Sequence, residues 1–211
     1  MPKNMQLNIV EPSNKRGLAR QQKFLEVAEN LFLTHGYANS SVNEIVRLAG
    51  GSLGTLYRIF GNKLGLFEAV FKRKSLEIFS EYSDGDYWHD DLEQSLFLFG
   101  KHLQSVALST DGLAIYRLVI TENNVDQQEI QRIFYKFGPE VAISMLSNYL
   151  KKHVDAGRIT LFDERLAASQ FLEMVKGPFI HRALFGETIL DEELDCALEQ
   201  AVKIFIKGCS T

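Results

Sequence analysis

Apolar residues recur every three to four positions along almost the whole chain, and this periodicity constrains the fold more than any other feature. In the clearest case, Phe24, Val27, Ala28, Leu31 and Phe32 fall at i, i+3, i+4, i+7 and i+8, which places them on one face of a helix. Similar stripes continue to about residue 207, and no segment shows the alternating pattern of a half-buried strand. The sequence therefore predicts an all-α protein.

Glycines and capping residues divide the first part of this pattern into short helices. Gly36 is expected to end a first helix that begins near residue 17. Ser41 stands three residues before a glutamate, the capping-box spacing, ahead of a short helix that ends at the glycine pair 50–51. Ser52 can cap a second short helix that ends at residues 61–62. Two short helices joined by a glycine turn, with a longer helix across them, predict a helix-turn-helix unit.

Longer helices are expected after residue 63, and two Gly-Pro pairs interrupt their pattern. Proline lacks a backbone N–H and clashes with the preceding turn, so Gly138-Pro139 predicts a kink or a restart. Gly177-Pro178 predicts a second kink, inside a helix over about residues 163–185. A last helix is expected over about residues 191–207.

Charge is divided unevenly between the two parts of the chain. The formal net charge is -4, which alone argues against a nucleic-acid partner. Residues 1–74, however, contain 11 Lys and Arg against 5 Asp and Glu, whereas residues 75–211 contain 12 against 22. A basic N-terminal part on an acidic body is the pattern expected when only one end of a protein meets phosphates.

The second short helix has a composition suited to the major groove, where such a helix reads base edges with its N-terminal residues. Gly54 lets the backbone come close to DNA, and Thr55 can hydrogen-bond a base edge or touch a thymine methyl. Tyr57 can reach a phosphate, and hydroxyls at a helix N-terminus also favour a phosphate. The candidate DNA-contacting residues are Arg16, Ser40, Ser41, Ser52, Leu53, Gly54, Thr55, Tyr57, Arg58 and Lys63.

The stretch from Ser41 to Phe60, followed by Lys63 and by Leu66-Phe67, resembles the DNA-binding domain of TetR-family regulators. The preceding helix, which ends in Ala-Glu-Asn-Leu-Phe-Leu-Thr-His-Gly-Tyr37, fits the same pattern. This resemblance implies phosphate contacts by Ser40 or Ser41, Tyr57 and Lys63, and base or groove contacts by residues 52–55 and Arg58.

Two positions depart from the family pattern. Leu53 stands where a basic or polar residue is common, which removes a possible guanine contact and leaves a thymine methyl as its partner. Ile59 stands where a histidine or tyrosine is common, which puts one phosphate contact in doubt.

Three stretches of the body are similar to the AefR-like branch of the family: residues 116–122, 134–140 and 170–177. The resemblance implies nine or ten helices, a homodimer formed through the last two long helices, and a body cavity for a small molecule. Ligand binding would change the spacing of the two DNA-binding domains and release a palindromic operator. The expected domains are a flexible basic arm (1–16), the helix-turn-helix domain (17–62) and a helical-bundle domain for ligand binding and dimerisation (63–211).

The ligand-contacting residues are harder to assign, because most body aromatics lie at ordinary core spacing. Polar groups on apolar helices can orient a ligand, since pockets use few, well-placed polar groups. The candidates are Trp88, Tyr116, Glu122, Phe134, Phe137, Gln170, Phe171 and Met174.

Other classes of protein have less support. The histidines lack metal-binding spacing, Cys196 and Cys209 form no CxxC motif, and no catalytic or nucleotide-binding motif occurs, so we expect no enzyme activity, metal or cofactor. No signal peptide or apolar run long enough for a bilayer is recognised, which predicts a cytoplasmic protein without a membrane partner. Two alternatives remain: an enzyme on a helical bundle, and a helical ligand- or partner-binding protein that no longer binds DNA.

Overall fold

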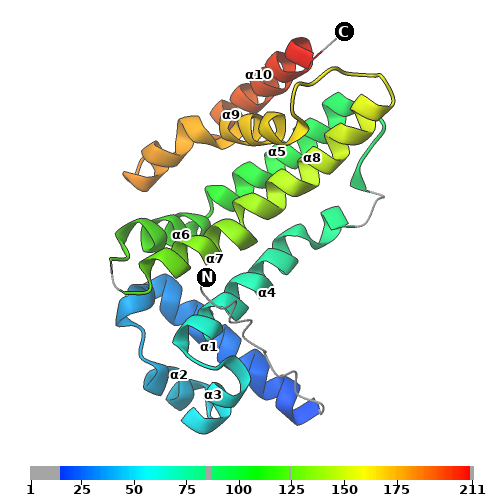
Figure 1. Ribbon diagram of the computed structural model, residues 1–211. Helices are drawn as coiled ribbons and strands as arrows, with labels where there is room; N and C mark the ends of the chain where they lie inside the picture. Colours follow the sequence, from blue (N-terminus) through cyan, green and yellow to red (C-terminus); the bar gives the residue numbers. More distant parts are fainter. Residues whose placement is uncertain (1–14, 84–86, 124, 210–211) are drawn as a thin grey trace. The chain divides into compact units, whose positions relative to one another are not determined.

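The computed structural model describes residues 15–83, 87–123 and 125–209, which form ten α-helices (Figure 1). The prediction of an all-α protein is confirmed for these residues. The helices are α1 (Lys15–Asn39), α2 (Val42–Ala49), α3 (Leu53–Phe60), α4 (Lys63–Ser83), α5 (Leu92–Ala107), α6 (Thr110–Thr121), α7 (Gln127–Phe137), α8 (Pro139–Asp155), α9 (Glu164–Leu184) and α10 (Asp191–Cys209).

The helices belong to two compact units. The first contains the described residues up to Leu76 together with Leu118–Phe137, and the second contains the described residues of Glu77–Arg117 and those from Gly138 onward. Helices α4 and α6 therefore each contribute to both units. The first unit extends beyond the predicted DNA-binding domain of residues 17–62, because it includes most of α4, the end of α6 and α7.

In the first unit, α1, α2 and α3 pack against one another around aromatic side chains. Phe24 of α1 meets Phe60 of α3 edge to face, with ring centroids 6.3 Å apart. A second group joins Phe32 and Tyr37 of α1 to Phe67 of α4, with centroids 5.2 to 5.7 Å apart. Each buried aromatic side chain stabilises the fold by about 1.5–3 kcal/mol relative to an exposed one.

Helix α1 differs at both ends from its prediction. It begins at Lys15, so Lys15 and Arg16 are helical rather than part of the arm; residues 1–14 of that predicted arm lie outside the described residues. Gly36 interrupts the helix with φ 78°, a left-handed value that favours glycine, and one further turn follows it as far as Asn39.

Helix caps were predicted with mixed success. Ser52 caps α3 as expected, because its hydroxyl accepts from the backbone N–H of Thr55 at 3.1 Å. Ser41 occupies the N-cap of α2, but its side chain makes no capping hydrogen bond, so the capping box was wrong. The Asn62 side chain accepts from the N–H of Gly65 at 2.8 Å and thus caps α4.

The second unit is built from α5, α8, α9 and α10, which pack pairwise around one apolar core. The restart predicted at Gly138-Pro139 is confirmed, since α7 ends before it and Pro139 opens α8, where its missing N–H has no helical partner to lose. Pro178 lies inside α9. On α5, the buried Gln104 amide donates to the carbonyls of Val175 in α9 (3.1 Å) and Leu194 in α10 (3.2 Å). No helix among the described residues is both long and apolar enough to cross a membrane.

Candidate nucleic-acid interface

Helix α3 buries one side and exposes the other. Leu56, Ile59 and Phe60 are almost completely buried and hold the helix on the core of the first unit. Their spacing of three and four residues leaves the opposite face to solvent. The departure noted at Ile59 therefore has a structural explanation, because this side chain belongs to the core and does not face a ligand.

The exposed face of α3 carries the residues predicted to contact DNA. Leu53 is 37% exposed and Tyr57 is 45% exposed, and Gly54 and Arg58 are exposed beside them. Small residues at the N-terminus and long polar side chains further along suit a helix that inserts end-first into a groove.

The hydroxyls of Ser52 and Thr55 lie 3.0 Å apart at the N-terminus of α3. Ser52 is exposed and Thr55 is half-buried. Because each hydroxyl has one proton and two acceptor positions, both keep hydrogen-bonding capacity for a base edge or a phosphate beyond this contact.

Ser40 and Ser41 have different surroundings. Ser40 is buried, and its hydroxyl donates to the carbonyl of Gly36 at 2.6 Å. The predicted phosphate contact by Ser40 does not fit this geometry, because the hydroxyl is enclosed and bonded inside the unit. Ser41 is exposed at the first turn of α2, where backbone N–H groups also point outward.

The basic residues near the start of α1 also differ in their surroundings. Arg16 is exposed. Arg20, one of the basic residues of the N-terminal part, donates from Nη1 to the carbonyl of Ala49 at 2.9 Å and so ties α1 to the end of α2. This bond stabilises the turn between α2 and α3.

Lys63 is held against the end of α1. Its ammonium donates to the carbonyl of Ala38 at 3.3 Å and lies 4.4 Å from the ring centroid of Tyr37. Burial lowers the pKa of Lys63, and the carboxylates of Glu122 and Asp126 oppose that shift. With three N–H donors, the ammonium can bond Ala38 and still donate to a phosphate.

Two acidic residues of the first unit contact the same end of α1. The Glu122 carboxylate accepts from the N–H of Ala38 at 3.1 Å, and Asp126 accepts from the hydroxyl of Tyr37 at 2.8 Å. Burial and this hydrogen bond raise the pKa of Tyr37. Sequence patterns did not indicate these pairs, because their partners are more than 80 residues apart and follow no local spacing.

The residues predicted to contact a ligand are divided between the two units. Glu122, Phe134 and Phe137 belong to the first unit, and the other five belong to the second. Phe171 is fully buried against Phe205 in the core, whereas Gln170 is exposed on α9.

The remaining candidates in the second unit are partly buried. Trp88 stacks on Tyr149 with centroids 4.4 Å apart, and Met174 packs against the core. Burial raises the pKa of Tyr116, as does the nearby carboxylate of Glu173. Tyr116 and Met174 are thus both partly exposed, and Met174 is the one that packs on the apolar core.

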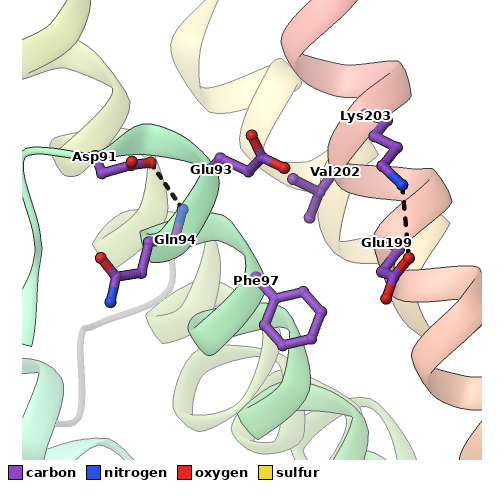
Figure 2. Close-up of a pocket in the computed structure, with 7 residues that line it drawn as sticks. All are labelled: Asp91, Glu93, Gln94, Phe97, Glu199, Val202 and Lys203. Atoms are coloured by element: carbon purple, nitrogen blue, oxygen red, sulfur yellow. Dashed lines mark hydrogen bonds and ion pairs between the residues drawn. The ribbon is translucent and has the colours of Figure 1, made fainter.

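A hollow of about 490 Å³ lies between α5 and α10 in the second unit (Figure 2). On the α10 side, the Lys203 ammonium is 3.5 Å from the Glu199 carboxylate one turn away. None of the predicted ligand-contacting residues lines it; the lining residues are Asp91, Glu93, Gln94, Phe97, Glu199, Val202 and Lys203. Within the described residues, no group of three or more His, Cys, Asp or Glu side chains could hold a metal ion.

Comparison with known proteins agrees with this arrangement. Residues 24–70 match the model of the bacterial regulatory proteins of the tetR family, and residues 94–208 match the C-terminal domain of AefR-like transcriptional repressors. The HTH-type transcriptional regulator YvkB of Bacillus subtilis (strain 168) is 29% identical over 203 residues, which cover 95% of this chain and 99% of YvkB.

Solved structures share the fold over nearly the whole chain. A putative TetR-family regulator from Mesorhizobium loti superposes with a TM-score of 0.80 at 23% identity, covering 94% of this chain and 100% of its own. The flavonoid-responsive regulator FrrA superposes with a TM-score of 0.76 at 25% identity, covering 90% and 97%. The AefR-like match alone spans more than half of the chain. The chain therefore belongs to the TetR family of bacterial transcriptional regulators, in its AefR-like branch.

Proposed function

We propose that this regulator is a repressor that reads its operator with the exposed face of α3. The observation that carries the proposal is the division of α3 into a buried apolar side and an exposed side of small and polar residues. Such a helix, with its N-terminal end uncovered, fits the major groove.

Each exposed residue has a role set by its chemistry. Ser52, Gly54, Thr55 and Arg58 face base edges or the groove wall, and Leu53 contacts a thymine methyl. Ser41, Tyr57 and Lys63 hold phosphates, and the exposed Arg16 adds a further phosphate contact near the start of α1. Because several contacts are ionic, affinity should fall steeply with salt concentration.

A homodimer formed through α9 and α10 would present two copies of α3. Both helices and the segments beside them expose large apolar side chains: Leu166 is 53% exposed, Ile204 is 53% exposed and Phe185 is 87% exposed. Burial of such side chains against a second copy of the chain would stabilise a dimer. Two-fold symmetry then predicts a palindromic operator.

A small molecule bound in the body would release the operator. The ligand must bind more tightly to the conformation that does not fit DNA, since equal affinity for both would shift nothing. Tyr116 and Met174, both partly buried, are the residues of the second unit that we assign to such a site. A regulator of this kind acts in the cytoplasm, where the bacterial chromosome lies.

The test is a gel-shift titration of the full chain on its own upstream DNA. Tyr57→Phe and the double variant Thr55→Ala/Arg58→Ala are measured beside it, with Lys151→Ala as a control at an exposed lysine on α8. We expect tight, salt-sensitive binding that both α3 variants weaken and the control keeps. Absence of binding by the native chain at low salt would favour a ligand-binding protein that no longer binds DNA.

A further inference from the structure

Glu122 is a buried acidic residue of the first unit. Glu122 follows the last residue of α6 and is only 6% exposed. Burying a carboxylate is unfavourable unless hydrogen bonds or opposite charges compensate for the lost water. Its partner in the first unit is the backbone N–H of Ala38, at 3.1 Å.

The peptide groups of Ala38 are held from two sides. Its N–H donates to Glu122, and its carbonyl accepts from the Lys63 ammonium at 3.3 Å. One residue earlier, the Tyr37 hydroxyl donates to Asp126 at 2.8 Å. Residues that lie far apart in the sequence thus converge on the last turn of α1.

This turn connects directly to the DNA-facing elements. Gly36 has non-helical backbone angles just before it, so the turn does not continue the straight path of α1. Two residues after it, Ser41 opens α2, the first helix of the helix-turn-helix unit. The direction in which α2 leaves, and the position of Lys63, therefore depend on contacts made to residues 37 and 38.

We propose that Glu122 and Asp126 are positioning residues for DNA binding, which hold residues 37–38 so that Ser41 and Lys63 face the phosphates. The proposal rests on the DNA-binding role described above. Simple electrostatics predicts that two carboxylates near a phosphate-binding surface weaken DNA binding, so that their removal strengthens it. If they are positioning residues, their removal weakens DNA binding instead.

The experiment compares two variants with the same change of net charge in the full-length protein. Glu122→Ala removes the buried carboxylate, and Glu129→Ala removes an exposed one on α7 that pairs with Arg132 three residues along. Affinity for a labelled fragment of the protein's own upstream DNA is measured by fluorescence anisotropy over a range of salt concentrations. Circular dichroism and thermal melting check that each variant is folded.

We expect Glu122→Ala to weaken operator binding by about tenfold or more, as for loss of a hydrogen bond to a charged group. The slope of its log affinity against log salt concentration should also become shallower by the amount expected for about one phosphate contact. Glu129→Ala should stay within about twofold of the native protein, as is usual for an exposed ion pair. Glu122→Gln should restore most of the affinity, because its amide oxygen can accept from the same N–H.

A second set of variants keeps the proposal testable if Glu122→Ala fails to fold. Tyr37→Phe removes only a hydroxyl, and Asp126→Ala removes its acceptor. If the two act through one contact, the double variant should bind DNA about as weakly as the weaker single variant.

A folded Glu122→Ala protein that binds as tightly as Glu129→Ala would overturn the proposal, as would unchanged affinity in both Tyr37→Phe and Asp126→Ala. A native protein that binds no operator would overturn the proposed function and this inference with it.

Discussion

Replacing Gly65 by alanine should destabilise the first unit, although it adds only one methyl group. Gly65 lies in the first turn of α4, and a Cβ built on it would be 2.0 Å from the carbonyl oxygen of Phe60 and 3.2 Å from the carbonyl carbon. That oxygen already accepts from the N–H of Asn62 at 2.9 Å. Real Cβ atoms essentially never approach closer than 3.0 Å, so Gly65→Ala requires the backbone between α3 and α4 to open.

The size of the effect follows from two opposing contributions. Overpacking a core costs about 1–3 kcal/mol, and a backbone obstacle that cannot rotate away places this site at the upper end. Alanine is a better helix former than glycine by about 1 kcal/mol, which offsets part of the cost. A net loss of about 2 kcal/mol corresponds to a fall in Tm of about 4–8 °C for a protein of this size.

Thermal melting followed by circular dichroism measures this loss, and the operator gel shift measures its consequence for α3. Gly54→Ala is the matched control, because its added Cβ meets only the Ser52 hydroxyl, at 3.9 Å. We expect Gly65→Ala to lose both stability and DNA affinity, and Gly54→Ala to keep or slightly raise its Tm but bind DNA more weakly. A Gly65→Ala protein that melts at or above the native temperature would refute the packing reasoning.

Three other predictions concern separate sites. Tyr57→Phe should weaken operator binding by about threefold to tenfold while leaving the circular dichroism spectrum unchanged, since it removes one hydroxyl from an exposed side chain; equal affinity would exclude the Tyr57 hydroxyl as a phosphate contact. Burial lowers the pKa of His153, so the stability it contributes is full above its unfolded value of about 6.5 and declines as the pH falls below that. Between pH 7.5 and 5.5, His153→Phe should therefore lose less Tm than the native protein, and an equal loss would contradict this. Gln104→Leu should lower the free energy of unfolding, measured by urea denaturation, by about 1–3 kcal/mol, because the carbonyls of Val175 and Leu194 each lose one donor; an unchanged midpoint would contradict this.

Local patterns were sufficient to predict a helical chain and several of the places where helices begin, end or restart. The proline at 139 marked the start of α8, and the Ser52 cap was confirmed. Each of these features depends on residues within a few positions of one another, so it can be recognised from a short stretch of sequence. The same is true of the helix-turn-helix motif, whose glycines and caps lie within a short stretch.

Only the tertiary structure decided how individual polar groups are used. Ser40 and Ser41 are adjacent and chemically identical, yet the Ser40 hydroxyl is buried and donates to the carbonyl of Gly36, whereas Ser41 is exposed to solvent. Glu122 was predicted to be a ligand contact from its place on an apolar helix, but its carboxylate accepts from the N–H of Ala38, 84 residues away. Hydrogen bonds at such separations are set by how helices pack, because a polar side chain bonds whichever group the fold brings within about 3 Å.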